Sequence, residues 1–507
     1  MIEGALTILI LIPLVGAVFL LVAPRNDRQA KWSALGVTLV ALGFGLYILL
    51  DFVVTGGFNL PLFDFAYKET APWVPTLGIS YTLGMDGLSF AMVLLTLIIF
   101  PPAILFAFSE HKELRKFFAM LLAMEAAITG VFLAEDFFLF YVFWEAVLIP
   151  MFFLIHGWGG DNRRYAAMKF FIYTHVASVV MLIGFLAMYF QYAAQSTPAV
   201  YSFDMASIGR YLTLHPELKA FQSFAFILVF FGFAVKMPSF PFHTWLPDAH
   251  VQAPTAGSVI LAALLLKMGG YGLIRVAVAM LPEGAKDWVL LMVVLGVASM
   301  IYGAFVCLRA DDLKRLIAVS SVSHMGFVMI AVASLNNIGI AAAIFQMFSH
   351  GLISAMLFMM AGAIGHNVGT RKISELGGIN AKVPRIGAFT MFAFLASLGL
   401  PALVGFAAEF TVLLSFNAAF GYLVAIPLIT VLVTAAYYLW AGQRALFGPV
   451  NPTLDKADIH DLKPFETAAL TVLAALIVLF GVLPYLFMDY VVPFSTHLAS
   501  ALGGGIV

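Results

Sequence analysis

Six titratable side chains lie inside long apolar stretches of the sequence, and their residue types suit the movement of protons. A charged group at mid-membrane depth costs about 2.5–3.5 kcal/mol on insertion scales, so such groups are hidden from lipid and are usually functional. Carboxyl, amine and imidazole groups can each bind and release a proton, and burial disfavours the charged form of each. The candidate relay consists of Glu145, Lys236, Lys267, His324, His350 and Glu409.

Two of these residues flank a break in an apolar run. Lys236 stands just before the segment that contains Pro238 and Pro241, and Lys267 lies deep in the following apolar run. Proline cannot continue a helix, and such breaks are tolerated at membrane depth only where protein or water satisfies the backbone. A broken helix beside a buried charge is typical of a transport site.

The order of these groups along the chain suggests a direction of transfer. A nearby carboxylate favours the charged form of a buried lysine, so we predict that Glu145 sets the charge state of Lys236. The proton would then pass to Glu409, which follows a second break at Leu400-Pro401. Three central groups would carry it there, Lys267, His324 and His350.

Other interpretations of these residues remain open at this point. The two histidines are also compatible with hydrogen-bonded core residues, or, less favoured, with axial haem ligands. Glu145 and Lys236 are also compatible with a purely structural ion pair. Glu125 is a weaker candidate for the relay, because its position is also compatible with a contact to a neighbouring subunit. A further group either lines a path from the inside or caps helix ends, namely His243, Asp248, His250 and Arg275.

The composition predicts an all-α polytopic membrane protein that forms one integral domain over residues 1–507. Hydrophobic residues make up 63% of the 507 residues and charged residues only 10%. A net charge of -1 gives no basic surface for nucleic acid. The single cysteine, Cys307, excludes an internal disulfide and a cysteine-held iron–sulfur cluster.

The apolar runs predict fourteen membrane spans. Spans 7 and 12 are the broken ones. They are five spans apart, an odd number, so they cross the membrane in opposite directions, which predicts two inverted five-helix repeats at 116–280 and 286–446. Residues 57–84 alternate in polarity and predict an exposed hairpin. The predicted spans are 3–23, 32–52, 86–108, 116–134, 136–156, 165–193, 221–246, 254–280, 286–308, 313–334, 338–365, 386–416, 419–446 and 466–490.

The lysines and arginines of the loops predict the orientation. Most of the 26 follow odd-numbered spans, whereas the loops on the other side contain only Lys68, Arg210, Lys219 and Lys286. Because basic loops stay in the cytoplasm, both termini are expected on the outer side of the membrane.

Several motifs resemble those of the antiporter-like, proton-translocating subunits of respiratory complex I and of multisubunit cation/proton antiporters. The resemblance covers about residues 1–490, and the length and Glu409 are similar to M-type chains, the counterparts of mitochondrial chain 4. The motifs are DGLSF at 86–90, FWEAVLIPMFFLI at 143–155, the stretch 231–276, KRLIAVSSVSHMGF at 314–327 and the break that ends in Glu409.

The resemblance implies roles for the six residues. Glu145 and Lys236 would form a coupling ion pair, Lys267 would be the central lysine, and Glu409 would be the terminal proton site. His324 and His350 would belong to the hydrophilic axis between them.

The resemblance also implies the surroundings of the chain. It implies a bacterial inner-membrane subunit that couples NADH-to-quinone electron transfer to proton pumping. Its partners would be other membrane subunits of complex I, especially the neighbouring L and N chains, besides lipid and protons. No cofactor is expected in this chain, because NAD, FMN, iron–sulfur clusters and quinone would belong to other subunits. The alternative is a D-type subunit of a sodium/proton antiporter, which shares the glutamate of span 12.

Overall fold

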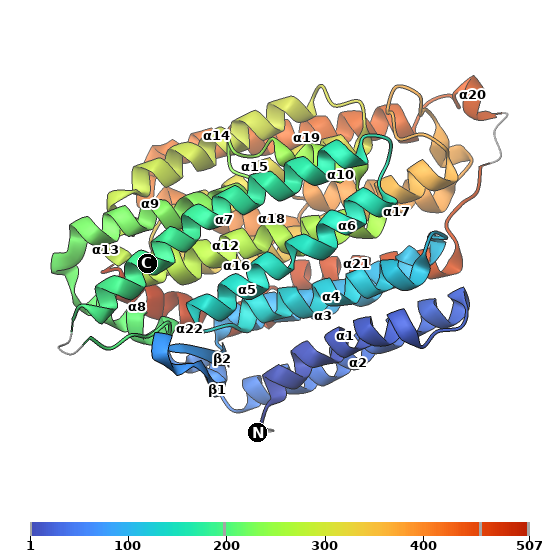
Figure 1. The fold of residues 1–507 in the computed structure, drawn as a ribbon. Helices are drawn as coiled ribbons and strands as arrows, with labels where there is room; N and C mark the ends of the chain where they lie inside the picture. Colours follow the sequence, from blue (N-terminus) through green and yellow to red (C-terminus); the bar gives the residue numbers. More distant parts are fainter. Residues whose placement is uncertain (1–2, 196–198, 456–458, 504–507) are drawn as a thin grey trace.

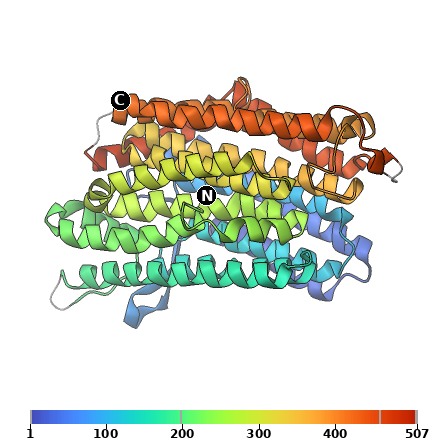
Figure 2. The same cartoon turned by 90° about the horizontal axis from the view of Figure 1, so that it is seen from above.

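Long helices run side by side along one bundle (Figures 1 and 2). The structure is a computed structural model, and it describes residues 3–195, 199–455 and 459–503. The prediction of an all-α polytopic membrane fold is confirmed, with a two-stranded hairpin at one end of the bundle.

The first half of the chain forms α1 (Ala5–Val22), α2 (Asp27–Val54), β1 (Ala66–Val74), β2 (Ile79–Met85), α3 (Gly87–Phe106), α4 (Leu114–Leu133), α5 (Phe137–Ala146), α6 (Leu148–Trp158), α7 (Arg163–Ala193), α8 (Met205–Leu214), α9 (Lys219–Lys236), α10 (Trp245–Gln252), α11 (Thr255–Ile260) and α12 (Leu266–Gly272). The second half forms α13 (Pro282–Asp287), α14 (Val289–Cys307), α15 (Leu313–Ala333), α16 (Asn337–Asn367), α17 (Pro384–Ser397), α18 (Val404–Phe420), α19 (Ala425–Leu446), α20 (Pro452–Asp455), α21 (Pro464–Val482) and α22 (Tyr485–Ala501).

Within the described residues, 13 helical stretches are long and apolar enough to cross a membrane. One of them, Val404–Leu446, contains both α18 and α19 and therefore corresponds to two predicted spans. Gly421 stands between them with a φ of 58°, a left-handed conformation that glycine adopts without steric cost. α17 and α18 together form the interrupted span 12.

The two predicted helix breaks are present. α9 ends at Lys236, and α10 begins only at Trp245 after the proline-containing segment. α17 ends at Ser397, and α18 begins at Val404 after Pro401. The chain therefore interrupts both spans next to a residue of the predicted relay, Lys236 in one and Glu409 in the other.

Further irregularities were not predicted. Span 5 is irregular at Val147, two residues after Glu145, where α5 ends and α6 begins although the backbone angles of Val147 stay helical. Span 8 contains two π-helical segments, η5 (Leu261–Leu265) and η6 (Leu273–Val278), on either side of α12. Such π segments occur frequently at functional sites, and here they flank Lys267.

The hairpin packs against one end of the bundle, which we call the hairpin end; the opposite end is the far end. β1 and β2 are antiparallel, with Ala66 opposite Met85 and Val74 opposite Ile79, and two irregularities interrupt the register. β2 is mostly buried and β1 is mostly exposed, so only one strand of the predicted exposed hairpin faces outwards.

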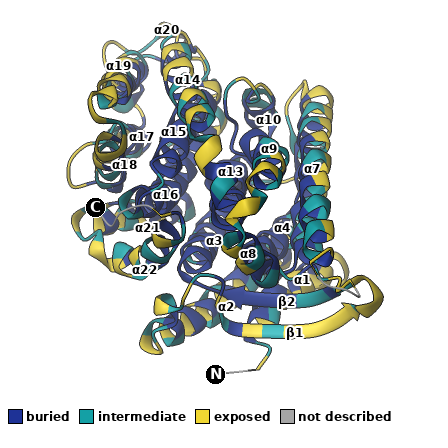
Figure 3. Ribbon diagram, turned by 90° about the vertical axis from the view of Figure 1, so that its left-hand side faces the viewer, coloured by how far each residue is buried: buried dark blue, intermediate teal, exposed yellow. Residues whose placement is uncertain are grey.

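The most buried helices lie in the middle of the bundle when it is viewed from the hairpin end (Figure 3). α15, α16 and the α11–α12 region are buried on all sides, whereas α1, α2, α7 and α19 expose apolar faces. A buried helix that carries histidine or lysine must satisfy these groups within the protein. The fold therefore places the middle of the predicted relay away from lipid.

The end of the chain corrects one predicted boundary. A single span over 466–490 was expected, but α21 ends at Val482 and a separate helix, α22, begins at Tyr485. Pro484 stands between them, where it lacks the backbone donor that a continuous helix needs. α22 packs against α3 and α16.

Candidate proton-relay site

Lys267 and His350 are in direct contact at the centre of the bundle. Nζ of Lys267 lies 2.7 Å from Nδ1 of His350 and donates a hydrogen bond of 2.5 Å to the carbonyl oxygen of Ala262. On the other side of the imidazole ring, Nε2 of His350 lies 3.1 Å from Oγ of Ser321. The lysine and the imidazole can therefore exchange a proton without an intervening group.

A second pair continues this line. Nδ1 of His324 lies 2.9 Å from Oε1 of Glu409, and Nε2 lies 3.3 Å from Oγ of Ser397. Oγ of Ser397 donates a 2.9 Å hydrogen bond to the hydroxyl of Tyr438. The rings of His324 and His350 have centroids 5.4 Å apart. Lys267, His350, His324 and Glu409 thus form one continuous buried row.

The backbone of span 8 explains the position of Lys267. The carbonyl oxygen that binds Nζ of Lys267 belongs to Ala262, a residue of the π-helical segment η5. Gly269 allows α12 to approach α9, since a Cβ there would lie 2.6 Å from the backbone nitrogen of Met237. Span 8 therefore packs directly against the break that follows Lys236.

Glu145 and Lys236 are not hydrogen-bonded to each other in the described structure. Oε2 of Glu145 lies 2.8 Å from Nδ1 of His175, and Oε1 accepts a hydrogen bond from Ser178. Nζ of Lys236 is without a hydrogen-bond partner among the described residues and lies 5.4 Å from the ring centroid of Trp144. The lysine side chain is buried, and the Glu145 charge acts on it across a gap.

His175 is a functional candidate that sequence reasoning missed. It lies in the middle of α7, and its ring stacks on Phe171 with centroids 5.6 Å apart. The sequence does contain a signal for it, because a histidine inside the apolar run 165–193 is as unfavourable in a membrane as the histidines of spans 10 and 11. Its contact with Glu145 depends on how α5 and α7 pack, and no sequence spacing gives that.

The structure decides between the alternatives for two secondary candidates. Glu125 does not face outwards: it is buried, and its Oε1 accepts a 2.9 Å hydrogen bond from Thr38 of α2. The apolar pattern alone does not indicate that α2 covers this face of α4. Arg275 lies at the hairpin end and not with the other three candidates, because its guanidinium binds both carboxylate oxygens of Asp86 at 2.6 Å.

The ion pair of Arg275 belongs to a polar cluster at the hairpin end. Asp86 also caps α3 by accepting hydrogen bonds from the backbone nitrogens of Leu88 and Ser89. Glu135, between α4 and α5, lies nearby, with Oε1 4.0 Å from Nε of Arg275. Neither carboxyl oxygen of Glu135 has a hydrogen-bond partner among the described residues. Burial holds the pKa of Glu135 well above its usual value.

The remaining candidates lie between the row and the far end. Asp248 forms a 2.6 Å ion pair with Lys169, and His250 is fully buried with its ring stacked on Phe358. His243 packs against Phe240 and Tyr302. His243 lies in the loop before α10, and Asp248 and His250 lie inside that helix, so none of them is its cap residue.

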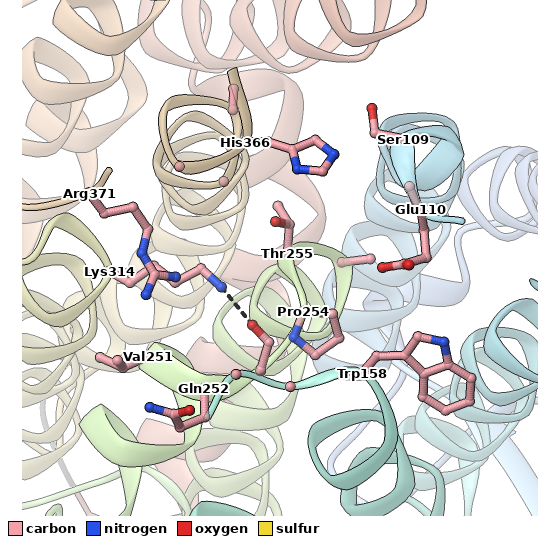
Figure 4. Close-up of a pocket in the computed structure, with 18 of the residues that line it drawn as sticks. Ser109, Glu110, Trp158, Val251, Gln252, Pro254, Thr255, Lys314, His366 and Arg371 are labelled. Atoms are coloured by element: carbon pink, nitrogen blue, oxygen red, sulfur yellow. Dashed lines mark hydrogen bonds between the residues drawn. The ribbon is translucent and has the colours of Figure 1, made fainter. Parts of the chain in front are cut away.

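A cavity of about 660 Å³ opens at the far end beside α10. Its lining includes Val251, directly after His250, and also Lys314, Glu110 and His366 (Figure 4). Lys314 points into it and donates a 2.6 Å hydrogen bond to the carbonyl oxygen of Ala253 (Figure 4). The cavity has polar lining residues and is large enough for water, and its lining residue Val251 is the direct sequence neighbour of the buried His250.

The contacts of the two central histidines bear on the haem interpretation. Both ring nitrogens of His324 and of His350 are engaged by protein groups. Axial ligation of a haem would have to break one contact at each ring, and a ring separation of 5.4 Å leaves no room for a porphyrin between them. Within the described ranges there is no group of three or more His, Cys, Asp or Glu residues that could hold a metal ion.

Comparison with known proteins assigns the family. The family model described as "NADH:quinone oxidoreductase/Mrp antiporter, TM" matches residues 134–434, more than half of the chain. The chain belongs to this family. The matched region includes all six residues of the predicted relay together with His175.

Relatives and solved structures agree over nearly the whole length. Subunit M of the NADH-quinone oxidoreductase of Rhodobacter capsulatus is 39% identical over 98% of this chain and 96% of its own. Subunit M of the F(420)H(2) dehydrogenase of Methanosarcina mazei is 42% identical, covering 98% of each chain. A chain of respiratory complex I from Thermus thermophilus superposes with a TM-score of 0.87 and 28% identity, covering 98% of this chain and 100% of its own. The predicted resemblance to an M-type chain is confirmed.

Proposed function

We propose that this chain is a proton-translocating membrane subunit of an NADH-quinone oxidoreductase. The observation that carries the proposal is the buried row Lys267–His350–His324–Glu409, in which each group can bind a proton and each neighbour lies within direct or ring-to-ring contact. Buried ionisable groups contribute little net stability, so a purely structural role in holding the helices together does not explain this row.

Glu145 and Lys236 control the loading of this row in the proposal. Lys236 is buried and has no hydrogen-bond partner among the described residues, so the position of the Glu145 charge decides how well the charge of Lys236 is tolerated. When the carboxylate approaches, Lys236 holds a proton; when it withdraws, Lys236 releases the proton towards Lys267. Span 8 packs against the break after Lys236, which supports transfer between the two lysines.

The far-end cavity supplies protons to this row. His250 is fully buried and directly precedes Val251, a residue of the cavity lining. Water in the cavity would reach Val251, and His250 would bridge the remaining distance. Glu409 is the terminal site, next to the backbone that the break at Pro401 leaves outside the helices.

Redox chemistry belongs to other subunits in this proposal. NAD, FMN, iron–sulfur clusters and quinone would be bound elsewhere in the complex, and this chain would carry ion transport alone. Electron transfer in those subunits would provide the free energy, because moving one charge against 100 mV costs about 2.3 kcal/mol.

Partner subunits would cover the exposed face of α7. The side chain of Glu145 is 22% exposed and that of His175 is 43% exposed, and the exposed residues next to His175 on α7, Ile172 and Val176, are apolar. Polar groups at membrane depth avoid lipid, so a protein neighbour fits this face. We expect an L-type or N-type chain there, in a bacterial inner membrane with both termini of this chain outside.

The two inverted repeats at 116–280 and 286–446 belong to the same proposal.

A second candidate function differs only in the electron donor. The relative that is 42% identical is named as a subunit of an F(420)H(2) dehydrogenase. The relay would work identically there, because the donor is oxidised by other subunits. Copurification of this chain with an NADH-oxidising or an F(420)H(2)-oxidising arm distinguishes the two, and copurification with neither would favour the antiporter alternative.

Proton uptake into inverted membrane vesicles tests the proposal. Lys267→Ala and His350→Ala variants, each normalised to the amount of assembled complex, are expected to lose most electron-transfer-driven uptake. His215→Ala is a matched control, because His215 lies at the hairpin end, where Nδ1 of its ring lies 2.7 Å from the carbonyl oxygen of Tyr211. Wild-type uptake in both relay variants would refute the proposal.

A further inference from the structure

Glu145 is bound by one helix and acts electrostatically on a residue of another. His175 and Ser178 of α7 supply its hydrogen bonds, whereas Lys236 at the end of α9 feels its charge but has no hydrogen-bond partner among the described residues. His175 and Ser178 are three residues apart, so they lie on the same face of α7. The carboxylate is thus held by α7, at the exposed side of the bundle.

Lys236 is correspondingly isolated. Its Nζ lies 5.4 Å from the ring centroid of Trp144 and 5.8 Å from that of Phe170. Aromatic faces attract an ammonium group only weakly compared with a carboxylate in direct contact. Lys236 is 1% exposed, so bulk solvent does not reach its ammonium group. A buried lysine in this position gains strongly if Glu145 turns towards it.

We infer that His175 is the alternate partner of Glu145, a positioning residue that holds the carboxylate away from Lys236 in one state of the pump. This inference rests on the proposed function and adds the group that competes with Lys236. In the state seen here, Nδ1–H of His175 donates to the carboxylate and Lys236 is ready to release its proton. In the other state, Glu145 leaves α7 and pairs with Lys236, which then holds a proton.

An irregularity in span 5 gives Glu145 the freedom to change partners. Val147, two residues after Glu145, keeps helical backbone angles, but the helical hydrogen bond from Met151 to its carbonyl oxygen is stretched to 3.5 Å. A small rotation at this junction would redirect Glu145 without moving either whole helix. A ligand or neighbour that binds one arrangement better shifts the population towards it. A partner subunit on the exposed face of α7 would contact His175 directly.

Loss of the His175 hydrogen bond should therefore trap Glu145 on Lys236. In His175→Phe the ring and its stacking on Phe171 are kept, but the donor is removed. In His175→Gln the stacking is lost, but a side-chain N–H can still donate to the carboxylate. The inference predicts that Gln retains more proton pumping than Phe. A role in packing alone predicts the reverse order.

The experiment measures proton uptake in inverted vesicles, normalised to assembled complex, for His175→Phe and His175→Gln. His156→Phe is the matched control, because His156 stacks on Phe152 at 5.7 Å just as His175 stacks on Phe171. One hydrogen bond to a charged group changes an equilibrium by about tenfold or more. We therefore expect proton uptake in His175→Phe to be about tenfold lower than in wild type. His156→Phe should pump like wild type.

A structure of the assembled His175→Phe complex supplies the second readout. Glu145 should then lie within ion-pair distance of Lys236, whereas a carboxylate that stays on α7 would overturn the inference. Uptake in His175→Phe equal to wild type, or above that in His175→Gln, would also overturn it. The proposed function fails separately: it is wrong if Glu145→Gln and Lys236→Ala both pump normally, whatever the His175 variants do.

Discussion

Nδ1 of His324 lies 2.9 Å from Oε1 of Glu409, and this contact joins a fully buried helix to the half-helix that follows the Pro401 break. The contact turns two residues that are 85 positions apart in sequence into one proton-exchanging unit. Because the second nitrogen of the imidazole faces Ser397, a proton taken up on one side of the ring can leave on the other.

Glu409 should require a group that titrates. Glu409→Asp keeps a carboxyl group that is one methylene shorter, so partial proton pumping should survive. Glu409→Gln keeps the size but cannot bind and release a proton, so pumping should fall well below that of the Asp variant. Proton uptake per assembled complex measures the difference. A purely structural role would give the opposite order, with Gln tolerated better than Asp.

Glu145 and Lys236 should depend on each other. Lys236→Ala and Glu145→Ala should each assemble and pump at a strongly reduced rate, because each removes the charge that the other responds to. The double variant should be little worse than either single variant, since the coupling is already lost. Additive losses in the double variant would show that the two residues act independently.

The ion pair at the hairpin end should matter for stability. Arg275 is buried and binds Asp86 through two hydrogen bonds, so Arg275→Ala leaves an unpaired buried carboxylate and should cost about 3–5 kcal/mol. The apparent Tm of the purified complex measures this loss. Arg210→Ala removes an exposed ion pair to Asp64 and should change stability by at most about 1 kcal/mol. Equal Tm values for both variants would contradict the assignment.

Glu135 should make stability depend on pH. Burial raises its pKa in the folded protein, so the folded state binds its proton more tightly than the unfolded state. The folded protein therefore gains stability from Glu135 below the unfolded pKa of about 4.3 and loses it as pH rises towards the raised folded pKa. Glu135→Gln cannot ionise, so its apparent Tm should exceed wild type increasingly from pH 5 to pH 8. A difference that does not change with pH would contradict this.

Much of this arrangement was predictable because membrane insertion penalises every buried charge. The rule identified Lys267, His324, His350 and Glu409 from their depth in apolar runs, and the structure brings these four together. Proline located both helix breaks for the same kind of reason, since it cannot continue a helix. These inferences need only local sequence and the cost of burial.

Contacts between distant spans were less predictable. His175 escaped notice although it lies within an apolar run, because its importance comes from the packing of α7 against α5. Arg275 was grouped with His243, Asp248 and His250. It instead binds Asp86 at the hairpin end of the bundle, although the two residues are 189 positions apart in sequence. The division of span 5 and the π segments of span 8 involve no proline at the break itself, so local sequence gave no signal for them.

The central claim is that protons cross through the row that begins at Lys267. Its most direct test is the initial rate of electron-transfer-driven proton uptake in inverted vesicles that contain the assembled Lys267→Ala complex. The account predicts a rate at least about tenfold below wild type, because a proton-transfer group at one step is worth about 100-fold or more. A Lys267→Ala complex that takes up protons at the wild-type rate would contradict it.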